Sequence, residues 1–262
     1  MGLGYDRVGS GPPLVLLHGV GHRRQAFGAV VDLLTPHREL ILVDLPGHGA
    51  SPPLSVNGRA LVDVLLESVI GLLDELGLDR PHWAGNSLGG RLALEAGAAG
   101  RAATVTALSP AGFFRGQRDL AYARAIFKIM QVAGRRLEPL APKLVQTTAG
   151  RGLLYGAVLS RPSRLTPEQA LADIAAFLAA SDALSLILAS ISQFSGQVPA
   201  DVPVTIAWGT RDRLLSRHQA LVAKAQLPAA KFVRLRGCGH VPMTDDPELV
   251  AGVLLRGSGW PG

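Results

Sequence analysis

The sequence predicts an α/β protein in which helices flank a mostly parallel central β-sheet and a helical segment interrupts that sheet along the chain. Over residues 14–108, short apolar runs alternate with longer amphipathic segments, the rhythm of parallel strands joined by crossover helices. After Pro110 this rhythm stops, and roughly ninety residues follow with helical patterns and no clear strand. The strand pattern returns at Val202. At 262 residues, the chain is long enough for one large core that carries such an insertion.

Each predicted strand is a continuous apolar run that ends in glycine, proline or polar residues, as expected for strands buried on both faces. Between two of them, residues 61–73 repeat leucine and valine at helical spacing, which indicates a crossover helix. The predicted strands are 14–17, 40–43, 82–85, 104–108, 202–208 and 231–235, and the later helices are 216–226 and 247–255. We therefore expect a core domain of residues 1–110 and 201–262 and a helical cap of residues 111–200.

Composition and the N-terminal residues argue against several classes of protein. Because Cys238 is the single cysteine, an intrachain disulfide framework and a cysteine-based zinc site are excluded, which fits a reducing compartment. No cluster of histidine and acidic residues has metal-ligand spacing, so neither a metal nor another cofactor is expected. The N-terminus lacks the basic start and apolar stretch of a secretory signal, and no apolar run approaches the length of about 18 residues that a membrane span needs. We expect a cytoplasmic protein without stable membrane insertion.

The net charge of +6 is unevenly distributed. All ten Lys and Arg of residues 111–200 lie between Arg115 and Arg164, where Asp119 and Glu138 are the only acids. A basic surface attracts an anionic substrate, a lipid headgroup or nucleic acid. An ordinary solvated helix face is the simpler interpretation, and we expect no nucleic-acid partner. The sequence leaves the oligomeric state open.

A candidate nucleophile lies in the pentapeptide Gly85-Asn86-Ser87-Leu88-Gly89. The Gly-x-Ser-x-Gly pattern is typical of a serine on a strained turn between a strand and a helix. The small flanking residues allow the sharp turn, which projects the serine above the sheet at the N-terminus of the helix. Because the chain is rich in glycine, the pentapeptide alone proves little, and its surroundings must support it.

A serine hydroxyl needs a base within hydrogen-bond reach and an acid that orients the base. His240 follows the strand that ends near Leu235 in a glycine-flanked loop, whereas His218 lies in a helical stretch and is expected at the surface. Asp212 follows the preceding strand at a glycine-containing turn and is the expected acid. Asp245 and Asp246 are weaker candidates, better interpreted as a helix start before a proline.

Acyl transfer also requires hydrogen-bond donors for the oxygen that becomes negative. The backbone N–H of Leu88, directly after the serine, is one expected donor. The second is the backbone N–H of Val20, which stands between glycines in the loop after the strand at 14–17. His18 in the same loop is expected to hold the loop by hydrogen bonds rather than to take part in catalysis.

Five segments of the chain resemble the α/β-hydrolase fold superfamily, in its serine-nucleophile branch with a helical cap, which includes esterases, lipases and meta-cleavage product hydrolases. In order, they are 16–19, 44–51, 85–90, Gly209 with Asp212, and 239–242. The resemblance covers nearly the whole chain and implies the order Ser87, Asp212, His240 for a catalytic triad. It also implies that the loop 44–51 is structural, fixed by Asp44 and His48.

The resemblance implies further that the cap is inserted between the sixth and seventh strands, where it covers the serine and shapes the substrate pocket. Most members begin with a β-hairpin, but the residues before Leu14 leave room for one strand only, from Gly4 to Val8. Aromatic and methionine residues of the cap region are pocket candidates, although packing within the cap is the simpler explanation of their spacing. These candidates are Phe113, Phe114, Tyr122, Phe127, Met130 and Phe177.

A serine rather than an aspartate at position 87 counts against haloalkane dehalogenase and epoxide hydrolase activity. Asn86 resembles the Gly-Asn-Ser of meta-cleavage product hydrolases, but those enzymes usually have a more glycine-rich oxyanion loop and a tryptophan after the catalytic histidine, where this chain has Val241. We expect a serine esterase that acts on an apolar or amphiphilic small-molecule ester. A carbon–carbon bond hydrolase of the meta-cleavage type and a non-catalytic ligand-binding relative are the alternatives.

Overall fold

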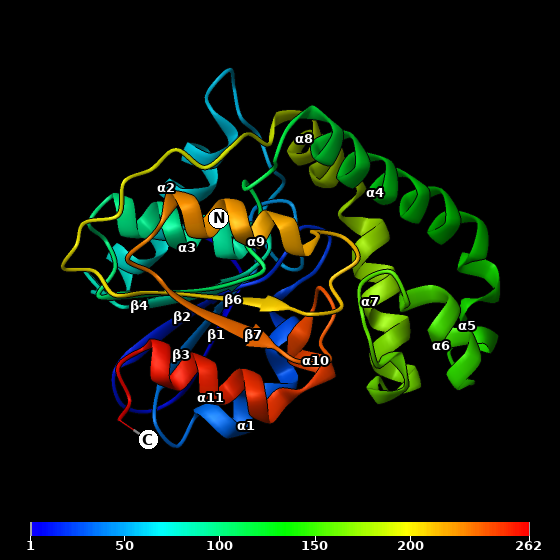
Figure 1. Cartoon of the computed structure of the whole chain (residues 1–262). Coiled ribbons are helices and arrows are strands. Elements are labelled where there is room, and N and C mark those ends of the chain that lie inside the picture. Colours follow the sequence, from blue (N-terminus) through cyan, green and yellow to red (C-terminus); the bar gives the residue numbers. More distant parts are fainter. Residues whose placement is uncertain (1, 262) are drawn as a thin grey trace.

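The computed structural model describes residues 2–261 and contains a seven-stranded sheet with the strand order β1-β3-β2-β4-β5-β6-β7 (Figure 1). β1 runs antiparallel to β3, and every other neighbouring pair is parallel, which confirms the predicted sheet. The strands are β1 (Tyr5–Gly9), β2 (Pro13–Leu17), β3 (Glu39–Val43), β4 (His82–Asn86), β5 (Thr104–Leu108), β6 (Val204–Gly209) and β7 (Lys231–Leu235).

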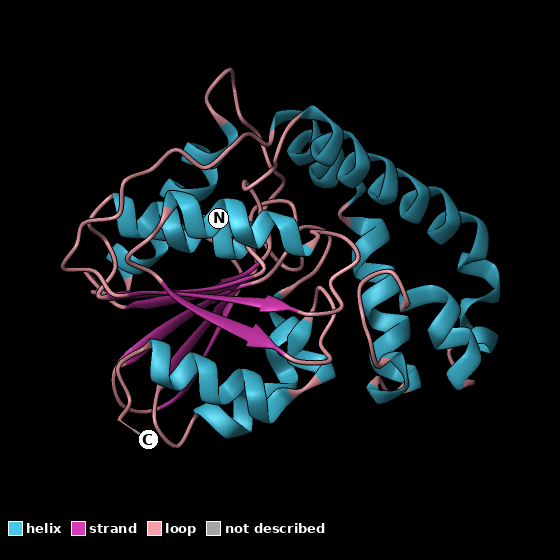
Figure 2. Cartoon of the chain, viewed as in Figure 1, coloured by secondary structure: helices cyan, strands magenta, loops and turns pink. Residues whose placement is uncertain are grey.

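Helices cover both faces of the sheet, because successive side chains of a strand point to opposite sides. In β2, Leu14 and Leu16 belong to one buried cluster, and Val15 and Leu17 belong to the other. α1 (Gly28–Leu34) and α11 (Pro247–Gly257) pack on the first side, and α2 (Leu61–Glu75), α3 (Leu88–Ala98) and α9 (Arg217–Gln226) on the second (Figure 2). Two short elements complete the core, a 3-10 turn at Arg24–Phe27 and α10 (Pro242–Asp245).

A helical insertion separates β5 from β6 and lies beyond the strand ends toward which the arrows of β6 and β7 point (Figure 2). Its helices are α4 (Gln117–Leu137), α5 (Ala141–Leu144), α6 (Thr148–Tyr155), α7 (Pro167–Ala179) and α8 (Ser181–Ser190), with 3-10 turns at Glu138–Leu140 and Pro162–Arg164. Local sequence sets the start of α7, where Thr166 and Gln169 form a capping box and Pro167 takes the first helical position.

The insertion follows the fifth strand of this chain and precedes the sixth. Because β1 alone precedes β2 in place of the hairpin, these two strands correspond to the sixth and seventh strands of a member that has the hairpin, where the family resemblance implied the insertion. Within residues 2–261, no single helix is both long and apolar enough to cross a membrane, and only the bent pair α7 and α8 meets the length and composition requirements together.

Candidate active site

Ser87 occupies a strained turn between β4 and α3. Its φ of 54° and ψ of −112° lie where non-glycine residues are uncommon. A Cβ atom at Gly85 would overlap the carbonyl carbon of Gly89, and a Cβ atom at Gly89 would overlap the backbone oxygen of Leu17. The two glycines therefore permit the close packing of strand and helix that holds Ser87 in this conformation.

Asp212 and His240 lie on the loops after β6 and β7 and meet at the carboxyl ends of these strands. Nδ1 of His240 donates a hydrogen bond of 2.8 Å to Oδ2 of Asp212, and both side chains are almost fully buried. The other carboxylate oxygen of Asp212 accepts the backbone N–H groups of Leu214 and Leu215, each at 2.9 Å. The carboxylate is thus fixed on both sides, and it directs the imidazole so that Nε2 is free to accept a proton.

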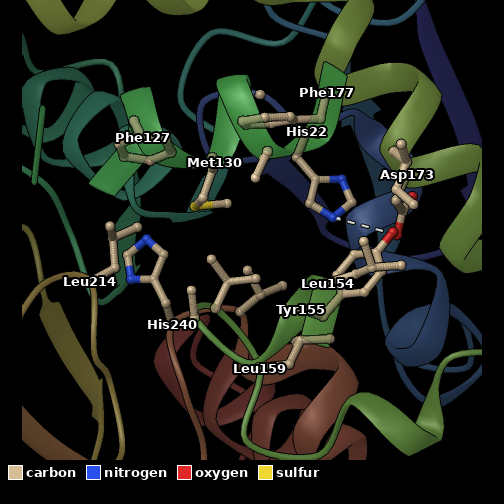
Figure 3. Close-up of a pocket in the computed structure, with 18 of the residues that line it drawn as sticks. His22, Phe127, Met130, Leu154, Tyr155, Leu159, Asp173, Phe177, Leu214 and His240 are labelled. Atoms are coloured by element: carbon tan, nitrogen blue, oxygen red, sulfur yellow. Dashed lines mark ion pairs between the residues drawn. The ribbon is translucent and has the colours of Figure 1, made fainter. Parts of the chain in front are cut away.

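Ser87 and His240 line the same cavity, so the structure brings the three predicted residues to one site. The hydrogen bonds formed within residues 2–261 include none from the Ser87 hydroxyl to His240. Such bonds are often long in the absence of substrate and tighten when substrate binds. Figure 3 shows the His240 imidazole at the cavity wall, beside Leu214 and facing Met130.

The two predicted oxyanion donors flank Ser87. Val20 lines the cavity, and the hydrogen bonds within the described residues assign no protein acceptor to its backbone N–H. Leu88 is the first residue of α3, so its N–H has no acceptor within its own helix. Neither N–H group has a protein acceptor among the hydrogen bonds of the described residues, and the role of both as oxyanion donors stays a prediction.

Two buried histidines hold the loop that carries Val20. Nε2 of His48 accepts the backbone N–H of Gly21 at 3.0 Å, and Nε2 of His18 accepts the backbone N–H of Leu45 at 3.0 Å. Burial lowers the pKa of His18 well below its usual value and also lowers the pKa of His48. Neutral rings can accept these bonds, and the structural role expected for His18 matches its contacts.

Asp44, the residue directly after β3, supports the same loop. Its carboxylate accepts the backbone N–H of Arg24 at 2.7 Å, the Arg24 guanidinium, and the backbone N–H of Ala50 at 2.9 Å. Asp44 is fully buried. The segment 44–51, expected to be a structural loop, therefore positions the residues beside the candidate nucleophile.

Asp245 has a role that the sequence did not indicate. The interpretation of Asp246 as a helix start is confirmed, because its side chain accepts the backbone N–H of Leu249 at 3.2 Å. Asp245 is instead fully buried, and its carboxylate accepts three backbone N–H groups. They belong to Gly239 (2.6 Å), Ser160 (3.0 Å) and Arg161 (2.6 Å). Asp245 thus joins the loop of His240 to the insertion.

The backbone of the His240 loop makes further contacts on both sides. The N–H of His240 donates to the carbonyl of Val158 in the insertion at 2.8 Å. Its carbonyl accepts the side-chain amide of Asn86 at 2.9 Å. The sequence singled out Asn86 for its resemblance to one class of enzyme and did not reveal this contact.

The single cysteine lies within the same loop. Cys238 is 1% exposed, and burial raises the pKa of its thiol to about 12. A protonated, buried thiol is a poor nucleophile. Within residues 2–261, no group of histidine, cysteine and acidic residues is arranged to hold a metal ion.

The cavity beside Ser87 encloses about 310 Å³ between the strand ends and helices α4, α6 and α7. Its wall is largely apolar, and three pocket candidates from the sequence, Phe127, Met130 and Phe177, line it (Figure 3). Leu154, Leu159 and Leu214 line it as well.

Three other pocket candidates were wrong. Phe113 and Phe114 are buried in the main core cluster, and Phe113 packs against Phe194 with ring centroids 5.6 Å apart. Tyr122 is 49% exposed on the outer side of α4, and its hydroxyl donates to the backbone carbonyl of Arg213 at 2.9 Å. An aromatic residue at helical spacing fits a core, a pocket or a surface position, so the pattern alone did not separate them.

One polar contact interrupts the apolar wall. Nε2 of His22 lies 3.9 Å from Oδ2 of Asp173 on α7, as Figure 3 shows by a dashed line, and a guanidinium nitrogen of Arg23 lies 3.7 Å from Oδ1. Burial lowers the pKa of His22, and the nearby Asp173 opposes that shift in part. A further polar contact between insertion and core lies outside the cavity wall, where His218 pairs with Asp119 of α4 at 2.7 Å.

Known proteins are similar to this chain over most of its length. A sequence model described as the alpha/beta hydrolase family matches residues 14–253. The pimeloyl-[acyl-carrier protein] methyl ester esterase of Xanthomonas campestris pv. campestris is 30% identical, with 96% of each chain covered. The dihydrolipoyllysine-residue acetyltransferase component of the acetoin cleaving system of Pseudomonas putida is also 30% identical over 94% of this chain, but the chain spans only 63% of that protein.

Solved structures share the fold. The meta-cleavage product hydrolase from Pseudomonas fluorescens IP01 superposes with a TM-score of 0.75 and 18% identity, over 97% of this chain and 93% of that one. At this level of identity the likeness concerns the architecture and leaves the reaction open.

Proposed function

Because the chain belongs to the α/β-hydrolase family, we propose that it is a serine hydrolase that cleaves a carboxylic ester through an acyl-enzyme intermediate. One observation carries this proposal: Asp212 and His240 form a buried hydrogen bond of 2.8 Å on the wall of the cavity that also contains Ser87. This is the arrangement that a serine needs to become a nucleophile.

The proposed reaction has two steps. Oγ of Ser87 attacks the ester carbonyl while Nε2 of His240 takes its proton, and Asp212 stabilises the charged imidazole that results. The carbonyl oxygen becomes negative and accepts the N–H groups of Val20 and Leu88. His240 then gives the proton to the departing alcohol, which leaves Ser87 acylated. In the second step water attacks the acyl carbonyl while Nε2 of His240 takes its proton. The bond between the acyl carbon and Oγ then breaks, the acid leaves, and His240 returns the proton to Oγ of Ser87.

We propose that the helical insertion, residues 111–200, is a cap that excludes water and shapes the substrate site. The contributions of α4, α6 and α7 to the cavity wall support this role. Because the wall is largely apolar, the substrate that fits best is an apolar or amphiphilic ester.

Asn86 was the sequence feature that favoured a carbon–carbon bond hydrolase. Its amide donates to the backbone carbonyls of Leu108, at 3.1 Å, and His240, at 2.9 Å. Asn86 thus has a structural use in this chain that does not depend on the bond cleaved, so its presence does not favour carbon–carbon cleavage over ester hydrolysis.

A fluorophosphonate probe tests the nucleophile. The wild-type protein is expected to be labelled and Ser87→Ala is not. Ser160→Ala is the matched control, since Ser160 lies beside the His240 loop but bonds Asp245 through its backbone N–H, which the substitution keeps. Absence of labelling in the folded wild type would overturn the hydrolase proposal. Turnover of a dienoic ring-fission product, with none of a series of p-nitrophenyl esters, would replace the esterase by a carbon–carbon hydrolase.

A further inference from the structure

The outer face of α4 combines cations with exposed apolar side chains and carries no acid. The exposed positions 118, 121, 122, 125, 128, 129, 132, 135 and 136 follow helical spacing, so they form one continuous stripe. Figure 1 shows α4 on the side of the insertion that faces away from the sheet. The single acid within α4, Asp119, turns inward to His218. We call these nine positions the α4 stripe.

The cations of the α4 stripe lack partners of opposite charge. No ion pair within residues 2–261 involves Arg118, Lys128, Arg135 or Arg136, although many arginines of the core are paired. Lys143 on the adjoining α5 is likewise exposed and unpaired among the described residues. The positive charge of this face therefore acts outward.

The same face reaches the mouth of the cavity. Ile129 of α4 is 62% exposed and Leu153 of α6 is 69% exposed, and both also line the cavity. Val132, one turn beyond Ile129, is 44% exposed. On the opposite side of α4, Phe127 and Met130 form part of the cavity wall. One helix thus presents aliphatic side chains to the exterior and walls the space next to Ser87.

We propose that the α4 stripe, with Leu153, docks on the surface of an anionic phospholipid bilayer, from which an amphiphilic ester passes into the cavity. The cations would contact lipid phosphates, and Ile129, Val132 and Leu153 would enter the boundary between headgroups and acyl chains. Aliphatic side chains placed among cations favour a lipid surface over an acidic protein or a nucleic acid. This inference rests on the proposed function only for its last part, the transfer of substrate to Ser87.

Vesicle flotation tests the docking. The wild-type chain is expected to float with phosphatidylcholine vesicles that contain roughly one third phosphatidylglycerol but not with pure phosphatidylcholine. Binding should weaken strongly between about 0.1 M and about 1 M NaCl, because the Debye length falls from about 10 Å to about 3 Å. Wild-type protein that stays unbound at low salt would overturn the proposal, and binding only to an acidic protein would do the same.

Two double variants separate the contributions of charge and apolar contact. Arg135→Glu with Arg136→Glu is expected to lower partitioning at least tenfold, because each cation near an anionic surface contributes about fivefold. Ile129→Ser with Val132→Ser should weaken binding at both salt concentrations. The matched control is Leu221→Ser with Lys224→Glu on α9, a leucine and a lysine that are likewise exposed but lie on the core. Equal binding by all three variants would contradict the proposal.

Activity measurements distinguish failure of the docking from failure of the proposed function. Arg135→Glu with Arg136→Glu, neither of which lines the cavity, should keep the wild-type kcat/KM on a short, water-soluble ester and lose activity on an ester held in anionic vesicles. Ser87→Ala should bind vesicles like the wild type and hydrolyse neither. If the wild type binds vesicles but hydrolyses no ester, the docking stands and the esterase proposal falls.

Discussion

The side-chain amide of Asn86 donates a hydrogen bond of 2.9 Å to the backbone carbonyl of His240, 154 positions further along the chain. Its second amide hydrogen reaches the carbonyl of Leu108 at the end of β5, 3.1 Å away. An amide has two donors, and both are used here. The residue before the candidate nucleophile thus fixes the backbone of the candidate base, while the ring of that base donates a hydrogen bond to Asp212.

Replacement of Asn86 by alanine is expected to lower both stability and catalysis. The buried carbonyl of His240 would lose the donor that Asn86 provides, and the carbonyl of Leu108 would keep only the backbone N–H of Ser87, at a cost of about 1–3 kcal/mol in the free energy of unfolding. Because the His240 backbone would gain freedom, kcat should fall about tenfold or more while KM changes little. Urea unfolding and steady-state kinetics on a p-nitrophenyl ester measure the two effects. An unchanged kcat in the folded variant would show that Asn86 does not position His240.

Gly89→Ala is expected to destabilise the chain by about 3 kcal/mol or more, because the added Cβ would overlap the backbone oxygen of Leu17. Gly71→Ala is the matched control. Gly71 lies within α2, and a Cβ there would meet no atom within 4 Å, so this change should stabilise by about 0.5–1 kcal/mol. Chemical denaturation of both variants gives the comparison, and similar stabilities would refute the packing explanation of the turn at Ser87.

Asp245→Asn is expected to disturb the loop of His240, whereas Asp246→Asn is not. The first change replaces an acceptor oxygen of a buried carboxylate by a donor that faces a backbone N–H, and we expect a loss of about 3 kcal/mol in unfolding free energy and a lower kcat. Asparagine caps helices as well as aspartate does, so the second change should leave both quantities nearly unaltered.

Hydrogen exchange measures the opening of single amides, which the global free energy of unfolding does not report. In Asp245→Asn, the amides of Ser160 and Arg161 should exchange faster than in the wild type. The comparison is made without denaturant, at a pH where both proteins stay folded. Equal protection in the two proteins would mean that Asp245 does not tie the insertion to the His240 loop.

Stability is expected to fall as the pH drops below about 6.5, the usual pKa of histidine. Burial lowers the pKa values of His18, His22 and His48 in the folded chain, so the unfolded chain binds more protons in this range. The stability that these three neutral rings contribute is fully present above the pKa of histidine in the unfolded chain. It is lost as the pH falls toward the lowered pKa values of the folded chain. Each histidine contributes a slope of up to about 1.4 kcal/mol per pH unit.

Urea unfolding at intervals between about pH 7 and about pH 5.5 measures this slope. This pH range lies above the usual pKa values of Asp and Glu. In His48→Gln, the amide oxygen can still accept the N–H of Gly21, and the slope should decrease by the share of one histidine. A flat profile in the wild type would contradict the assignment of these rings as neutral.

Periodicity in the sequence was sufficient to predict the sheet, the helical insertion and the positions of most strands to within two residues. Local motifs also predicted that Ser87, Asp212 and His240 act together. In the structure Ser87 and His240 line one cavity and Asp212 accepts a hydrogen bond from His240, while their catalytic roles stay predictions. The order of these residues along the chain and their positions after strand ends were enough for this prediction, because the carboxyl ends of parallel strands meet at one edge of the sheet.

The residues that support this site were not predictable in the same way. Asn86 and Asp245 form hydrogen bonds with backbone groups. Because nearly every residue has a backbone carbonyl and an N–H, the residue types do not show which of these groups a side chain will bind. Phe113 and Phe177 have the same apolar character, yet one is buried in the core and the other faces the cavity. Only the three-dimensional packing of the insertion separates these two outcomes.

Cys238 makes this chain well suited to site-directed labelling. Its thiol is buried and its pKa is raised to about 12, so maleimides and other thiol reagents should leave the native protein unmodified at neutral pH. A cysteine introduced at Ile129 or Leu153 would then be the only reactive thiol on the folded surface. A polarity-sensitive dye attached there would report, in real time and without removal of the native cysteine, when the residues at the mouth of the cavity pass from water into an apolar environment.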